Sequence, residues 1–236
     1  MKDKFKAQLC EFGIDLTTEQ EDQFQRYFEL LTEWNRVMNL TSISEQDEVY
    51  EKHFADSLAI AKFIDMNSIH SLIDIGTGAG FPGIPLKIAF PHLKVTLLDS
   101  LNKRVRFLNT VIDELRLEKI DAFHGRAEEF AKKESYRESY DLCVSRAVAD
   151  LSILSEYCIP FVNIGGYFVA YKSSEANDEI NRSTSAFQIL GGDLKDYIKF
   201  QIPYSEIGRS FVVIEKKKKT PGKYPRKAGT PAKEPL

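Results

Sequence analysis

The chain is poor in cysteine: its 236 residues include only Cys10, Cys143 and Cys158. Their odd number and their spacing fit neither a disulfide framework nor a metal site, so we expect reduced thiols and no bound metal. No apolar run approaches the roughly 20 residues that a membrane-spanning helix requires. The first five residues are too charged to begin a signal peptide. These absences predict a cytoplasmic protein that contacts no membrane.

Charge is distributed unevenly along the chain. The formal net charge is −3, yet residues 216–236 hold eight Lys or Arg and one acidic residue, Glu234. A basic tail on an acidic body can serve as a nucleic-acid arm, and its candidate RNA contacts are Lys217, Lys223 and Arg226. Because the segment is rich in Lys, Pro and Gly, we expect it not to pack on the body unaided.

Residues 1–66 are predicted to form a helical cap. Thr17 and Thr18, followed by Gln20 and Glu21, form two overlapping capping-box patterns, which mark the start of a helix. Apolar residues then recur at helical spacing through residues 24–37, which gives that helix one apolar face. The expected helices lie at 3–12, around 24–37, and from 44 to about 65.

From residue 71 onward, short apolar runs alternate with helical stretches, a pattern typical of βαβ units and a parallel sheet. The last two expected strands have little helix between them, which indicates a terminal antiparallel hairpin. We therefore predict an α/β core over 67–215, with a mostly parallel seven-stranded sheet, helices on both faces and one structural domain overall. Strands are expected at 72–75, 95–98, 120–123, 142–144, 167–170, 197–201 and 210–214, and helices at 84–90, 102–115, 127–134, 149–160 and 175–189.

The loop after the first expected strand is rich in glycine, which lets a backbone turn tightly and approach a ligand closely. Gly78-x-Gly80-x-x-Gly83, with Asp99 about 20 residues further on, fits the dinucleotide-binding fingerprint. The Asp99 carboxylate could accept hydrogen bonds from the ribose of a dinucleotide or of another nucleoside cofactor. It could also cap the following helix. Asp99 therefore supports nucleoside binding without identifying the cofactor.

The glycines begin earlier than that fingerprint requires, in Asp74-x-Gly76-x-Gly78. This arrangement resembles motif I of S-adenosylmethionine-dependent methyltransferases, in which the acid helps to organise the loop around the methionine end of the cofactor. The loop therefore favours S-adenosylmethionine, with a nicotinamide-dependent dehydrogenase as the alternative.

Several short motifs together resemble a known family, from about residue 10 to the end of the chain. The resemblance is to the RsmG family, also called glucose-inhibited division protein B. It implies a Rossmann-like class I S-adenosylmethionine-dependent methyltransferase that modifies N7 of one guanine in 16S ribosomal RNA, conventionally numbered 527. The motifs are Trp34-Asn35-x-x-x-Asn39-Leu40-Thr41, His53-x-x-Asp56-Ser57, the loop 74–83, Leu97-Leu98-Asp99-Ser100, Lys103-Arg104, Arg126-Ala127-Glu128-Glu129, Ser145-Arg146-Ala147 and Thr220-Pro221-x-Lys223-Tyr224-Pro225-Arg226.

The resemblance implies cofactor contacts at several positions, and the glycine-rich loop and Asp99 add further candidates. Ala127 and Glu128 begin a helix after the third strand, where adenine commonly lies in this fold. Glu128 is also an ordinary residue for a first helical turn, so its backbone is a better candidate than its side chain. Arg146 could pair with the cofactor carboxylate or an RNA phosphate, or form a surface ion pair. The full set is Asp74, Gly76, Gly78, Phe81, Asp99, Ala127, Glu128 and Arg146.

The target atom determines which catalytic groups are needed. Methyltransferases that act on amino groups often carry an Asp-Pro-Pro-Tyr-type motif after the fourth strand, where this chain has Ser145-Arg146-Ala147. That difference argues against methylation of an exocyclic amine. Guanine N7 has a free lone pair and no proton, so its methylation needs no general base, and we assign no catalytic residue.

Candidate substrate contacts lie in the cap and at the start of an expected helix: Asn39, His53, Lys103 and Arg104. His53 and Asp56, three residues apart on one helix face, could shape the substrate pocket or simply stabilise the helix. The expected partner is 16S ribosomal RNA or the small ribosomal subunit, and we expect a monomer. The alternatives are a methyltransferase that acts on small molecules and a non-enzymatic RNA-binding factor for ribosome assembly.

Overall fold

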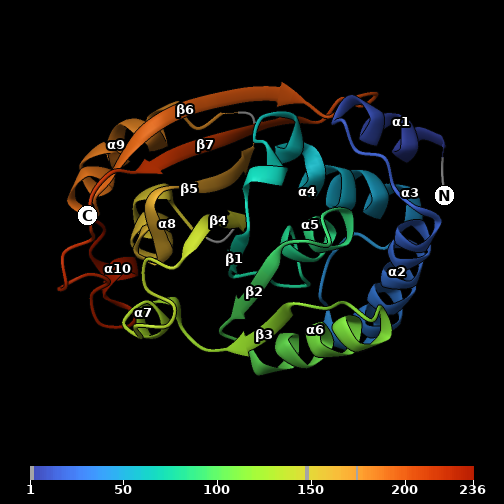
Figure 1. The fold of residues 1–236 in the computed structure, drawn as a ribbon, viewed down its shortest axis with the longest axis horizontal. Helices are drawn as coiled ribbons and strands as arrows, with labels where there is room; N and C mark the ends of the chain where they lie inside the picture. Colours follow the sequence, from blue (N-terminus) through green and yellow to red (C-terminus); the bar gives the residue numbers. More distant parts are fainter. Residues whose placement is uncertain (1–2, 147–148, 174) are drawn as a thin grey trace.

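The computed structural model describes residues 3–146, 149–173 and 175–236. Within them, seven strands form one sheet in the order β3-β2-β1-β4-β5-β7-β6, from the bottom of Figure 1 to the top. The first five strands are parallel neighbours, whereas β7 pairs antiparallel with both β5 and β6. The predicted sheet and its terminal hairpin are therefore confirmed. The strands are β1 (Ser71–Ile75), β2 (Lys94–Asp99), β3 (Ile120–His124), β4 (Tyr140–Arg146), β5 (Val162–Ser173), β6 (Gly192–Gln201) and β7 (Gly208–Lys216).

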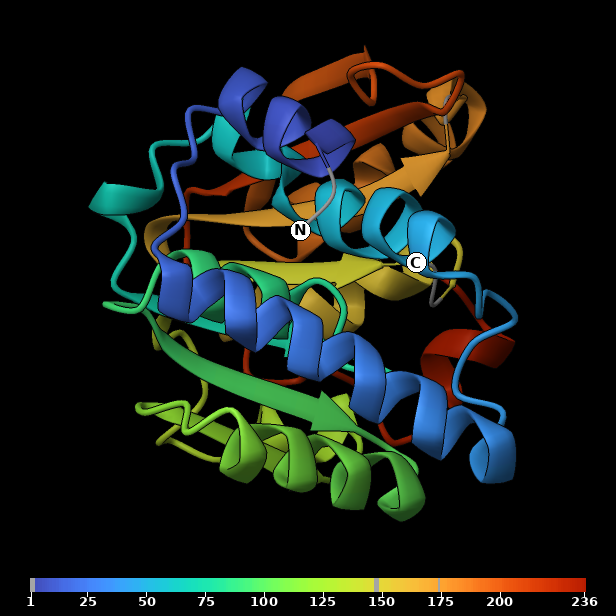
Figure 2. The same cartoon turned by 90° about the vertical axis from the view of Figure 1, so that its right-hand side faces the viewer.

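Helices cover both faces of the sheet, as predicted. Successive residues of a strand point to opposite faces, so Leu72 of β1 belongs to one hydrophobic core and Ile73 to the other. The first core packs under α5 (Gly83–Ala89), α6 (Asn102–Glu114) and the N-terminal helices. The second packs under α8 (Leu151–Cys158) and α9 (Asn177–Ile189). Figures 1 and 2 show these two layers around the sheet.

The N-terminal cap wraps over the first core. The predicted capping box is present: Gln20 N donates to Thr17 Oγ1 (3.3 Å) and Thr17 N donates to Gln20 Oε1 (2.8 Å). One turn is a wide π-helix, η1 (Tyr50–Ala55), and it carries His53. Such turns often occur at functional sites. The other cap elements are α1 (Asp3–Glu11), α2 (Thr18–Met38), α3 (Gln46–Val49), α4 (Asp56–Leu58), η2 (Ala59–Lys62) and η3 (Met66–Ser68).

The C-terminal segment packs on the body, so the prediction that it would not do so was wrong. The Lys216 ammonium is buried, and it donates to the Ile159 carbonyl oxygen (3.0 Å) and to Thr220 Oγ1 (2.6 Å). The Arg137 guanidinium donates to the carbonyl oxygens of Thr220 (2.8 Å) and Tyr224 (2.9 Å). The segment thus satisfies its polar groups on η4 (Ile159–Phe161) and on the turn before β4, and it ends in a short helix, α10 (Thr230–Lys233).

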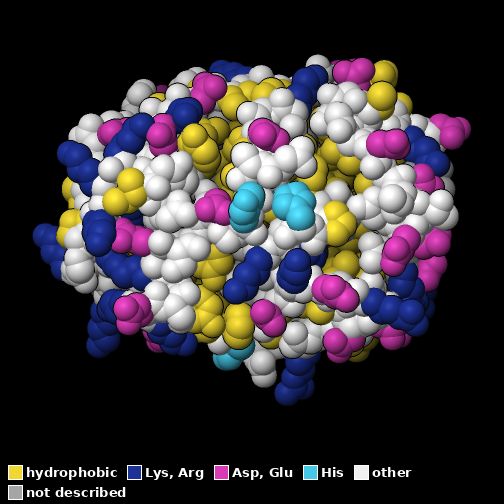
Figure 3. Space-filling model, viewed as in Figure 1, with side chains coloured by type: hydrophobic (Ala, Val, Ile, Leu, Met, Phe, Trp, Pro, Cys, Tyr) yellow, Lys and Arg dark blue, Asp and Glu magenta, His cyan; other side chains and the backbone are white. Residues whose placement is uncertain are grey.

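Arg226 anchors the same segment. Its guanidinium donates to both carboxylate oxygens of Glu156 in α8, with Nε at 3.0 Å from Oε1 and Nη2 at 2.7 Å from Oε2. Glu156 is fully buried, so Arg226 forms an ion pair with a buried carboxylate of the body. Lys217 and Lys223 remain exposed. In Figure 3, Lys and Arg side chains alternate with Asp and Glu over this end of the molecule.

No helix in the described ranges is both long and apolar enough to span a membrane.

Candidate active site

Two carboxylates hold the glycine-rich loop between β1 and α5. Asp74 Oδ2 accepts hydrogen bonds from Thr77 Oγ1 (2.7 Å) and Gly83 N (2.8 Å), so it ties the two ends of the loop together. Asp99, at the end of β2, accepts from Gly78 N with Oδ2 (2.9 Å) and from Leu101 N with Oδ1 (2.9 Å). Asp99 therefore shapes both the loop and the turn that leads into α6.

Asp74 has an oxygen that the protein leaves unsatisfied. The residue is fully buried, and within the described residues Oδ1 has no hydrogen-bond partner. Burial raises the pKa of Asp74 to about 7. A buried acceptor without a donor is costly, so Asp74 Oδ1 is the atom of the loop that a donor or a cation would stabilise.

Two hollows meet at the carboxyl ends of the strands, where ligands bind in open α/β sheets. The first, which we call the α7 hollow, has a volume of about 110 Å³ and lies beside α7 (Ala127–Phe130). The second, the loop hollow, has a volume of about 360 Å³ and lies against the glycine-rich loop and the cap. Both are lined by Gly76 and Ser100, so a single elongated ligand could occupy them together.

One wall of the loop hollow combines aromatic rings with a cation. The His53 ring stacks on Phe81 with 4.6 Å between ring centroids, and the Arg146 guanidinium lies 5.0 Å from the centre of the Phe81 ring. His53 Nε2 is 2.8 Å from Thr41 Oγ1. Burial, together with the positive charge of Arg146, lowers the pKa of His53 to about 3, so its ring is neutral at physiological pH.

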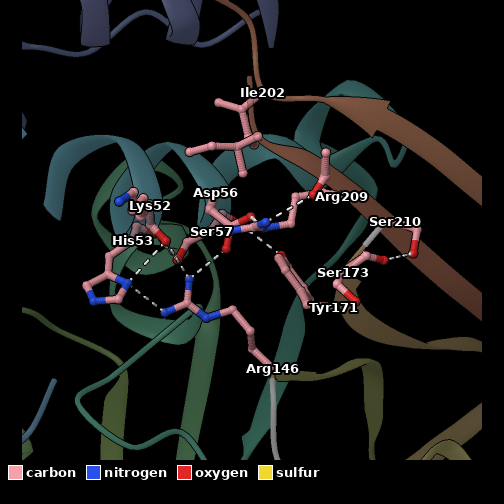
Figure 4. A network of polar contacts seen from close by, with 12 residues as sticks. Lys52, His53, Asp56, Ser57, Arg146, Tyr171, Ser173, Ile202, Arg209 and Ser210 are labelled. Atoms are coloured by element: carbon pink, nitrogen blue, oxygen red, sulfur yellow. Dashed lines mark hydrogen bonds and ion pairs between the residues drawn. The ribbon is translucent and has the colours of Figure 1, made fainter. Parts of the chain in front are cut away.

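Arg146 is held by a buried carboxylate. Its Nη1 donates to Asp56 Oδ2 (2.8 Å), and Arg209 Nε donates to Asp56 Oδ1 (2.8 Å). Figure 4 shows the two guanidinium groups approaching Asp56 from different strands, β4 and β7. Asp56 therefore binds two arginines from the sheet, instead of His53 three residues before it.

The structure brings most of the predicted site residues together. Gly76, Gly78, Phe81, Asp99 and Arg146 line the loop hollow with His53 and Arg104, while Ala127 and Glu128 line the α7 hollow.

Among the other predicted residues, Asp74, Asn39 and Lys103 line neither hollow, and the Glu128 side chain has a second role. Glu128 Oε1 accepts a hydrogen bond from Gly229 N (2.9 Å), so part of its carboxylate serves the C-terminal segment. Asn39 is exposed and ends α2 in a left-handed conformation. Lys103 is also exposed, and it donates to the Met38 carbonyl oxygen (3.5 Å). Ala147 lies outside the described residues.

Two residues that make contacts near the site could not be identified from the sequence. Tyr27 Oη donates to the Ala79 carbonyl oxygen (2.5 Å) and so links α2 to the loop. Its helical spacing predicts burial but does not identify a partner 52 residues away. Arg209 lies in a strand without any motif.

Within the described ranges, no three His, Cys, Asp or Glu side chains form a group that could hold a metal ion.

Replacing Gly80 by alanine should destabilise the loop. Gly80 has φ of +99°, and a Cβ there would lie 2.5 Å from Ile84 Cδ1 and 2.7 Å from Tyr27 Oη. The substitution adds backbone strain to a clash in a packed region. We expect Gly80→Ala to lower the free energy of unfolding by about 2–3 kcal/mol, measured by urea denaturation.

Alanine substitutions at two other glycines distinguish backbone strain from the steric clash. Gly13 has φ of +71° with nothing within 4 Å of an added Cβ, so Gly13→Ala carries the strain alone and should cost about 1 kcal/mol. Gly222 has free space around an added Cβ and no left-handed φ, so Gly222→Ala should change stability by less than about 0.5 kcal/mol. Equal losses for Gly13→Ala and Gly80→Ala would contradict a role for the clash.

Comparisons with known proteins agree with this architecture. The family model described as rRNA small subunit methyltransferase G matches residues 20–207. A protein of Exiguobacterium sibiricum named ribosomal RNA small subunit methyltransferase G is 49% identical over 233 residues, which cover 99% of this chain and 98% of that protein. A protein of the same name from Bacillus thuringiensis is 53% identical over 234 residues, with 99% of this chain and 98% of that protein covered.

A solved structure supports the fold alone. The StiE O-MT structure (residues 961–1257) superposes with a TM-score of 0.54 at 16% identity, and the match covers 76% of this chain and 80% of that one. The sheet order, the glycine-rich loop and the full-length similarity agree, and the chain belongs to the rRNA small subunit methyltransferase G family.

Proposed function

We propose that this protein transfers a methyl group from S-adenosylmethionine to N7 of a guanine in 16S ribosomal RNA, the guanine conventionally numbered 527. The observation that carries the proposal is the pair of joined hollows at the carboxyl edge of the sheet, in a chain whose family is named for methylation of small-subunit rRNA. Residues 67–215 would form the methyltransferase core, and the cap of residues 1–66 would contribute His53 to its wall.

The residues of the site fit S-adenosylmethionine. The unsatisfied Asp74 Oδ1 suits a cationic ligand with N–H donors, which the methionine end of this cofactor provides. Asp99, Gly76 and Gly78 are the candidates for holding the ribose and the methionine, and Ala127 and Glu128 for holding the adenine. Bound there, the cofactor would supply the methyl group as an electrophile.

The surroundings of the loop hollow suit an aromatic nitrogen that loses no proton. Guanine N7 attacks with a lone pair that is already free, so the protein has to position the base and exclude water. The neutral His53 ring, stacked on Phe81, offers an apolar edge beside the Arg146 cation. The absence of a proline pair after Ser145-Arg146 in the sequence also favours N7 over an exocyclic amine.

The proposal is tested with labelled cofactor. The protein is incubated with radiolabelled S-adenosylmethionine and with small subunits or bare 16S rRNA from a strain that lacks the modification. Nucleoside mass spectrometry should then find 7-methylguanosine at a single position. Label in small metabolites without RNA would instead support a small-molecule methyltransferase. RNA binding without label would support a non-enzymatic assembly factor.

A further inference from the structure

Two arginines share one buried carboxylate beside the proposed active site. Asp56, 3% exposed, accepts hydrogen bonds from Arg146 and Arg209, each at 2.8 Å. A single carboxylate cannot neutralise two guanidinium groups, so one positive charge remains in excess. The remaining Arg209 contact is Nη1 to the Gly208 carbonyl oxygen (3.0 Å), and within the described residues its Nη2 has no acceptor. The Nη2 group of Arg209 is therefore available to bind an anion.

These arginines border a cavity of about 400 Å³, which we call the Arg209 pocket. Lys52 and Lys172 add two more cations to its lining, and among the described residues that line it Asp56 is the one acid. The acidic partners of the two lysines reach in from outside the lining: Glu48 contacts Lys52 at 2.5 Å and Glu179 contacts Lys172 at 2.6 Å.

The Arg209 pocket adjoins the loop hollow. His53 and Arg146 line both cavities, so a ligand that extends past this shared wall would place one group in each. In RNA, every base is flanked by backbone phosphates, and arginine forks bind phosphate oxygens in a bidentate manner. A base in the loop hollow would therefore bring a phosphate of its own strand toward Arg209.

We propose that the Arg209 pocket binds a backbone phosphate of the substrate RNA next to the methylated base. This inference rests on the proposed function. A phosphate there would offset the excess charge on Asp56 and its two arginines, and it would fix the position of the strand while the base is read in the loop hollow. Arg209 would act as a positioning residue, because it contacts the RNA backbone and not the reacting atoms.

The test compares Arg209→Gln with the wild-type protein, using 16S rRNA that lacks the modification as the probe. We expect the KM for RNA to rise by about tenfold, as for loss of one charged hydrogen bond, with the Kd for S-adenosylmethionine and kcat nearly unchanged. The slope of log Kd for RNA against log salt concentration should become shallower by about 0.7, the value for one lost phosphate contact on a single strand. Arg209→Lys should restore the slope, because it keeps the charge.

Arg26→Gln is the matched control. Arg26 is a half-buried arginine that pairs with Glu29 and Glu114 and lines none of these cavities, so it should leave the slope and the KM unchanged. If Arg209→Gln fails to fold, Lys52→Gln tests the same pocket without touching Asp56, and a shallower slope is again expected.

Three results would be decisive. A wild-type protein that methylates no rRNA overturns the proposed function and this inference with it. An active wild type with an unchanged slope in Arg209→Gln and Lys52→Gln overturns the inference alone. A matching loss of affinity for S-adenosylmethionine in Arg209→Gln also overturns it, because the anion would then be the cofactor carboxylate.

Discussion

Arg226→Ala is expected to lower the free energy of unfolding by about 3–5 kcal/mol, the range for breaking a buried ion pair. The carboxylate of Glu156 is fully buried, and it accepts three hydrogen bonds from the Arg226 side chain and a fourth from Arg226 N (2.7 Å). Removal of the guanidinium would leave the buried Glu156 carboxylate ionised, with the Arg226 backbone N–H as its one donor from residue 226. Urea denaturation followed by circular dichroism measures the loss.

The design includes a control and a rescue. Lys227→Ala removes a neighbouring exposed cation and should change stability by less than about 0.5 kcal/mol. Glu156→Gln combined with Arg226→Gln removes both charges, so the double variant should be more stable than Arg226→Ala. A loss below about 1 kcal/mol for Arg226→Ala would show that water solvates Glu156 when the arginine is gone.

The sheet could be predicted because its signals are local. Each parallel strand is a short apolar run, and each crossover helix carries its own period of 3.6 residues. The expected strand at 72–75 is observed as Ser71–Ile75, and the expected helix at 102–115 as Asn102–Glu114. The helix expected at 127–134 ends earlier, at Phe130, where the Arg137 guanidinium binds the Ala131 carbonyl oxygen (3.1 Å) and the chain turns.

The contacts that could not be predicted join residues far apart in the sequence. Arg226 and Glu156 are separated by 70 positions, and Arg209 and Asp56 by 153. Composition alone predicts a solvated tail, because the number of charges in residues 216–236 does not reveal the buried groups of the body that bind them. The motif around His53 and Asp56 marked the right place, but it could not show that both arginines reach Asp56 from the sheet.

The stability of the protein should depend on pH through Asp74. Burial raises the pKa of this carboxyl from 3.8 to about 7, so the folded protein keeps the proton where the unfolded chain has lost it. Between about pH 4 and pH 7 the folded state therefore binds more protons, and its stability falls as the pH rises. A shift of this size corresponds to about 4 kcal/mol across the window. In the Asp74→Asn variant, the free energy of unfolding measured from pH 4 to 8 should not show this fall.

The same group should make cofactor binding depend on pH in the opposite direction. If a cationic ligand lies beside Asp74 Oδ1, it stabilises the ionised carboxylate, so binding below pH 7 requires loss of the proton. The affinity for S-adenosylmethionine should then strengthen as the pH rises toward 7, by at most about tenfold per pH unit, and level off above it. Calorimetric titration from pH 5.5 to 8.5 measures this, with Asp74→Asn expected to bind weakly and without the slope. A wild-type affinity that stays constant over this range would mean that Asp74 supports the loop through Thr77 and Gly83 alone.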